Sequence, residues 1–121
     1  MSLRVLFDKN VPVPLRRNLT GHQVRTATEE GWGTLGNGEL LARAEASGFD
    51  VLLTCDQNVQ YQQNLTRRKI SMVVLGSNIW PSVQTRLAEI ADAVAKAYPG
   101  SFAFIEIPPP ARHRPLPRSG I

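Results

Sequence analysis

The segment LRVLFDKN, residues 3–10, carries most of the information about the fold, because its apolar run stops at Asp8. A similar pattern recurs at residues 51–58, VLLTCDQN, where the apolar run ends shortly before Asp56. Short apolar runs that are rich in β-branched residues and closed by polar ones are typical of buried strands. Each segment therefore predicts a strand with an acidic residue just past its end.

Strand-like and helix-like segments alternate on both sides of these runs. Strands are expected at residues 3–7, 23–27, 51–54, 70–75 and 102–107. Helices are expected at residues 12–18, 38–47 with Asn37 as the cap, 59–65 and 81–98. This alternation predicts βαβ units, and hence a three-layer α/β sandwich with a mainly parallel sheet. The direction of the last strand is left open.

The acidic residues also predict the order of the strands. An open α/β sheet carries its site beyond the carboxyl ends of its strands, where the strand order reverses. Asp8 and Asp56 meet there only if the first and third strands are neighbours. The expected strand order is therefore 2-1-3-4-5.

The net charge of +4 is unevenly distributed along the 121 residues. Residues 1–107 carry 11 Lys and Arg against 10 Asp and Glu, whereas residues 108–121 add three arginines among five prolines. We expect one domain over residues 1–107, followed by a Pro/Arg-rich tail over 108–121 that is disordered because it buries little apolar surface.

The compartment is predicted from what the sequence lacks. No apolar run approaches the roughly 18 residues that a membrane span requires, and the first residues do not follow the plan of a signal peptide. The single cysteine, Cys55, has no partner for an internal disulfide. These features predict a cytoplasmic protein that does not enter the membrane.

The residues that could carry chemistry are three acids and two amides. Asp8 and Asp56 are each followed two positions later by an asparagine, Asn10 and Asn58, and Glu39 falls in the first turn of an expected helix. Oxygen ligands of this kind suit Mg²⁺ or Mn²⁺. The alternative is that the two aspartates only cap the helices that follow them, and that Glu39 only stabilises its own helix through the helix dipole.

The sequence also resembles a known family. The segments that carry the resemblance are LFDKNVP at 6–12, GHQV at 21–24, GW at 31–32, NGELL at 37–41, DVLLT at 50–54 and DQN at 56–58, continuing through YQQNL at 61–65. In this pattern, which spans about residues 3–107, the chain resembles the bacterial PIN-like domain proteins. These are compact relatives of the PIN-domain nucleases that act as toxins in toxin–antitoxin pairs.

The resemblance implies an RNase-H-like sheet that binds Mg²⁺ or Mn²⁺ and cleaves RNA. Asp8, Glu39 and Asp56 match the acidic positions, as both catalytic residues and metal ligands, and Asn10 and Asn58 match the supporting ones. It further implies RNA as substrate and a small antitoxin-type protein as partner. A homodimer is a separate expectation.

Two departures from the family pattern favour an alternative without catalysis. The family usually has Asp-Glu-Asn where this chain has Asp8-Lys9-Asn10, and a fourth acid near the position of Asn58. Lys9 would place a cation beside the metal or pair with a phosphate. The alternative function is a degenerate PIN-like module that binds RNA or a protein partner.

Three consecutive basic residues could contact nucleic acid. Arg67, Arg68 and Lys69 are the expected nucleic-acid contacts, with a solvated loop as the alternative. A phosphoacceptor receiver domain shares the strand order, but receivers pair two adjacent acids after the first strand and place a lysine after the fifth. This chain has Lys9 at the first of these places and Ile107-Pro108-Pro109 near the second.

Overall fold

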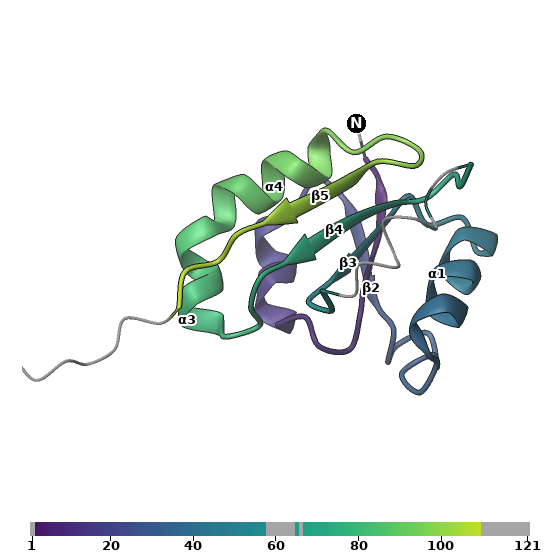
Figure 1. Cartoon of the computed structure of the whole chain (residues 1–121), viewed down its shortest axis with the longest axis horizontal. Helices are drawn as coiled ribbons and strands as arrows, with labels where there is room; N and C mark the ends of the chain where they lie inside the picture. The colour runs from purple at the N-terminus through teal and green to yellow at the C-terminus, as the bar shows by residue number, and fades with distance from the viewer. Residues whose placement is uncertain (1, 58–64, 66, 110–121) are drawn as a thin grey trace, which may run out of the picture.

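A computed structural model describes residues 2–57, 65 and 67–109. Its strands are β1 (Arg4–Phe7), β2 (Gln23–Thr26), β3 (Val51–Thr54), β4 (Ser71–Leu75) and β5 (Phe102–Ile105). They form one sheet in the order β2-β1-β3-β4-β5, and every neighbouring pair is parallel (Figure 1). The predicted strand order is confirmed, and the last strand is parallel as well. Most of the helix expected at 59–65 and most of the expected tail lie outside the described residues.

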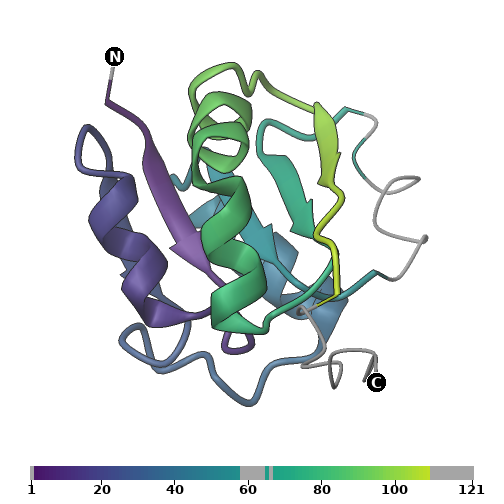
Figure 2. The ribbon, with the colours of Figure 1, turned by 90° about the vertical axis from the view of Figure 1, so that its left-hand side faces the viewer.

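Helical segments cover both faces of this sheet. The segment α1 (Asn37–Ala46) lies on one side, and α3 (Trp80–Val83) and α4 (Leu87–Ala95) lie on the other (Figure 1). The 3-10 helix η1 (Val13–Asn18) lies beside α4 (Figure 2). The three-layer α/β prediction is therefore confirmed. None of the helices in the described part of the chain is long and apolar enough to cross a membrane.

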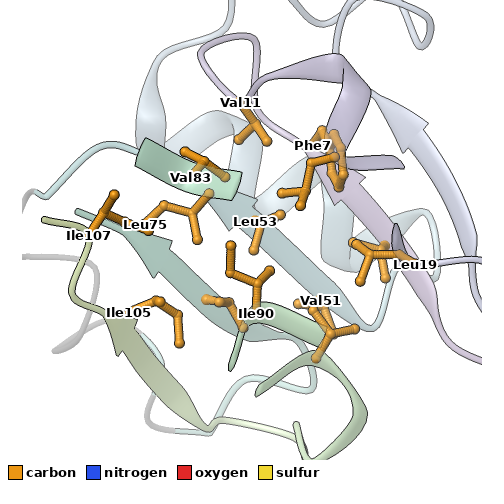
Figure 3. Close-up of a cluster of buried hydrophobic side chains, with 14 residues drawn as sticks. Phe7, Val11, Leu19, Val51, Leu53, Leu75, Val83, Ile90, Ile105 and Ile107 are labelled. Carbon is orange, nitrogen blue, oxygen red and sulfur yellow. The ribbon is translucent and has the colours of Figure 1, made fainter. Parts of the chain in front are cut away.

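The central strands β3 and β4 are buried on both faces, and all their residues are apolar except Thr54 and Ser71. Val51 and Leu53 of β3 belong to the cluster under α3 and α4, whereas Leu52 belongs to the cluster under α1. Figure 3 shows the first of these clusters, where side chains from four strands meet those of α3 and α4. Side chains alternate between the faces of a strand, so continuous apolar runs can fill two cores at once.

The long helix expected over residues 81–98 is interrupted, and this prediction was wrong in its extent. A short 3-10 segment, η2 (Gln84–Arg86), separates α3 from α4. At the junction Arg86 has φ −126° and ψ 23°, outside the helical region. The Thr85 hydroxyl donates to the Ser82 carbonyl at 2.7 Å, and such local bonds compete with the regular helix ladder.

The expected cap of α1 also differs from the observed one. Gly36 is the residue that precedes the helix, with extended backbone and no side-chain cap, and Asn37 is already helical. Glu39 is the acid of the first turn, as predicted, where the helix dipole favours a negative charge.

Candidate functional site

Asp8 and Asp56 lie just past the carboxyl ends of the neighbouring strands β1 and β3, at the point where the strand order reverses. The chain passes from β1 to β2 on one side of the sheet and returns to β3 on the other, with Phe7 paired to Leu53. Asp8 directly follows β1, and its N–H donates to the Leu53 carbonyl at 2.9 Å. Asp56 stands two residues beyond β3. The sheet therefore brings these two acids to one rim, as the sequence predicts.

Thr54, the last residue of β3, ties the two acids together. Its hydroxyl donates to Asp8 Oδ2 at 2.7 Å and accepts the Asp56 N–H at 3.1 Å. The other carboxylate oxygen of Asp8, Oδ1, accepts the Lys9 N–H at 2.7 Å. Asp8 is only 7% exposed, so these bonds supply the polar partners that a buried carboxylate needs. We call Asp8, Thr54 and Asp56 the rim triad.

Two amide side chains join the loops around this triad. Asn10 Oδ1 accepts the Cys55 N–H at 3.1 Å, which links the loop after β1 to the end of β3. Gln57 Nε2 donates to the Gly76 carbonyl at 3.0 Å, which links that end to the loop after β4. Asn10 therefore holds the ends of β1 and β3 together, and its predicted role as a supporting ligand stays a prediction. Asn58, its predicted counterpart, lies outside the described residues.

Glu39 is not gathered with the two aspartates into one centre. It is exposed in the first turn of α1. Among the described residues, no group of three or more His, Cys, Asp or Glu side chains is placed to hold a metal ion. The structure thus brings together Asp8 and Asp56, and the role of Glu39 stays a prediction.

The basic cluster Arg67-Arg68-Lys69 lies near the opposite end of the sheet. It precedes β4, whose carboxyl end shares the rim with Asp8 and Asp56. A strand of five residues spans roughly 17 Å, so the cluster and the acids are on different rims. The structure does not bring them together.

Glu45 of α1 engages part of this cluster. Its carboxylate accepts the Lys69 N–H at 2.6 Å and an Arg68 guanidinium N–H at 3.0 Å. The Lys69 N–H and the Arg68 charge lower the pKa of Glu45. Arg68 therefore fastens the turn before β4 to α1, whereas Arg67 is exposed in that turn with a positive φ of 74°.

Cys55 sits inside the rim but is unsuited to nucleophilic chemistry. Burial, with a smaller contribution from the Asp8 charge, raises the pKa of its thiol to about 12. The thiol faces the Ser77 carbonyl, with Sγ 3.5 Å from the oxygen. Since the thiolate is the reactive form, this cysteine acts as a packing residue against the core cluster under α3 and α4.

Native Cys55 is expected to react with iodoacetamide near pH 8 at least about tenfold more slowly than in the denatured chain, because its thiolate population is far smaller. Mass spectrometry of quenched samples measures both rates. The stability gained by keeping the thiol protonated is present below pH 9 and is lost as the pH rises toward 12. Equal rates of alkylation in the two states would contradict this assignment.

Comparison of the chain with models of protein families, with curated proteins and with solved structures found no match. The fold is therefore established here by its own topology: a small α/β domain with a five-stranded, all-parallel sheet.

Proposed function

We propose that the protein is a divalent-cation-dependent ribonuclease of the PIN-like type. The observation that carries this proposal is the rim triad at the reversal of strand order, in which one hydroxyl, that of Thr54, donates to the Asp8 carboxylate and accepts the backbone N–H of Asp56. Ligands of open α/β sheets bind in this crevice. The resemblance of the sequence around Asp8 and Asp56 to PIN-like proteins supports RNA as the substrate.

The residues of the rim fit a magnesium or manganese ion. Each oxygen of the Asp8 carboxylate accepts one hydrogen bond in the structure, and an ionised carboxylate has about four acceptor positions. Magnesium is commonly bound through one or two carboxylates, with water and substrate phosphate supplying the remaining ligands. Asp8 and Asp56 would hold the ion, so a third acid is not required.

Each residue of the rim then has a definite task. A bound cation would make water a better nucleophile and offset the charge of the phosphate. Thr54 keeps the Asp8 carboxylate in one orientation, and Asn10 holds the end of β3 beside the loop after β1. Lys9 is exposed at the rim, where its ammonium can pair with a phosphate of the RNA backbone.

Millimolar Mg²⁺ or Mn²⁺ is expected to raise the melting temperature, since a ligand of the native state alone stabilises it. At ten times the dissociation constant the gain is about 1.4 kcal/mol, or roughly 5 °C for a domain of this size. Asp8→Asn should lose most of this response. Differential scanning fluorimetry with and without EDTA measures it.

Asp92→Asn is the matched control for that experiment. Asp92 is an exposed carboxylate on α4 that pairs with Lys96, so its loss changes the net charge equally but leaves the rim intact. A melting temperature that neither cation changes would count against the site. So would an equal loss of response in both variants.

One observation favours a second function, a PIN-like module that binds RNA or a small antitoxin-type protein without cleaving it. Among the described residues, Asp8 and Asp56 belong to no group of three or more His, Cys, Asp or Glu side chains placed to hold a metal ion, and Lys9 occupies the position of the family's usual glutamate. The cation-response experiment does not separate the two functions. Cleavage of RNA does.

A further inference from the structure

A pocket of about 330 Å³ opens at the carboxyl ends of β1 and β2, next to the rim triad. It lies between the loop after β1, the η1 segment and the residues that end β2. The residues that line it include Asp8, Lys9, Val11, Val13, Arg16 and Glu29. At the small end of the roughly 300–1,000 Å³ typical of ligand pockets, it has room for one small group.

One wall of the pocket is apolar and rigid. Val11, which is almost fully buried, and Val13, which is 55% exposed, both line the pocket. Pro12 and Pro14 flank Val13. Because proline fixes its own φ and restricts the residue before it, this wall is ordered before any ligand arrives. An exposed valine on a rigid concave wall is suited to the face of a flat apolar ligand.

The other wall offers hydrogen-bonding groups. Glu29 Oε1 accepts from Arg16 Nη2 and from the Thr26 N–H. These bonds lower the pKa of Glu29, so its carboxylate is charged at neutral pH. The Arg16 Nε–H is buried and has no hydrogen-bond partner among the described residues. A ligand acceptor that met Arg16 here after a small side-chain shift would supply the partner that this donor lacks.

We propose that this pocket binds one unpaired nucleobase of the RNA strand that the rim cleaves, with the adjoining phosphate beside Lys9. This inference rests on the proposed function. A base has flat apolar faces for Val13 and an edge of donors and acceptors for Glu29 and Arg16. Asp8 lines both the pocket and the rim, so a base held here places its own phosphodiester next to the acid pair. A base-paired strand could not present its base in this way, so the substrate is single-stranded.

The test is titration of the full chain with the four nucleoside 5′-monophosphates and with ribose 5-phosphate, all in EDTA. At least one nucleotide should bind at least about tenfold more tightly than ribose 5-phosphate, because burying the base removes apolar surface from water. Amide chemical shifts of Thr28 and Glu29 should report the binding. Val13→Trp fills the pocket from an exposed position and should abolish it.

Arg16→Gln and Arg25→Gln form a matched pair for the polar wall. Arg25 makes a similar ion pair with Glu30, but it does not line the pocket. Nucleotide binding should weaken in Arg16→Gln and stay unchanged in Arg25→Gln. The proposal would be overturned if the two arginine variants had equal effects or if Val13→Trp still bound nucleotide. It would also be overturned if no nucleotide bound, or if ribose 5-phosphate bound as tightly as the nucleotides.

Failure of this inference is distinguishable from failure of the proposed function. EDTA removes the cation, so nucleotide binding is measured independently of cleavage. Cleavage without nucleotide binding would reject the pocket alone. Binding at the pocket without cleavage would reject the nuclease and support RNA binding by the same rim.

Discussion

Asp56→Asn is expected to lower cation-dependent cleavage of single-stranded RNA by roughly 100-fold or more. Loss of groups that only support metal ligands already costs about 10–100-fold, and loss of a ligand should cost at least as much. The exchange preserves the shape of the side chain and removes its charge. Initial rates on a labelled RNA, at saturating Mn²⁺, measure the effect.

Asp92→Asn again serves as the control for this assay, because it removes one exposed carboxylate that is distant from the rim in the fold. It should cleave at the wild-type rate. If Asp56→Asn cleaved as fast as Asp92→Asn, the rim could not be the site of the reaction. Addition of EDTA to the wild type should also abolish the cleavage of RNA.

Thr54→Val is expected to lower the free energy of unfolding by about 2–3 kcal/mol, which is large for one exchange of equal volume. The variant leaves a nearly buried Asp8 carboxylate without its Oδ2 donor and the Asp56 N–H without its acceptor. Burying a charged group without its hydrogen bond is among the costliest single changes. Urea unfolding followed by circular dichroism measures the difference.

Thr54→Ser separates the hydroxyl from the methyl group. Serine keeps both hydrogen bonds and loses only one methyl, so it should cost about 1 kcal/mol or less. If Thr54→Val proved no less stable than Thr54→Ser, the hydroxyl would not be holding the rim. The rate of RNA cleavage should likewise fall more in Thr54→Val than in Thr54→Ser, because the orientation of the Asp8 carboxylate depends on this hydrogen bond.

The sheet could be predicted from the sequence because its signals are local. The first, third, fourth and fifth strands contain short apolar runs, and the second alternates apolar and polar residues. The helix-like segments between strands favour a mainly parallel sheet, although the direction of the last strand was left open. The order of the strands was predicted from chemistry, since Asp8 and Asp56 can share a rim only if β1 and β3 are neighbours. The structure confirms that order.

The features that escaped prediction depend on contacts between distant residues or on local competition. Thr54 reads as an ordinary strand residue, and only the register of β1 against β3 reveals that it binds Asp8. The Glu45–Arg68 ion pair joins residues from separate elements in the same way. The break at Arg86 follows directly after Thr85, whose hydroxyl bonds back to the Ser82 carbonyl, and a helical pattern of apolar residues does not show such local competition.

The most direct test of the central claim is cleavage of a labelled single-stranded RNA across a Mn²⁺ titration, by the wild type and by Lys9→Glu. The account predicts cleavage by the wild type that rises with Mn²⁺ and disappears in EDTA. It also predicts that Lys9→Glu acts at lower Mn²⁺ concentrations, because it replaces a cation at the rim by a carboxylate. RNA that binds both proteins but stays intact at every Mn²⁺ concentration would contradict the claim, and the rim would then be a binding surface without catalysis.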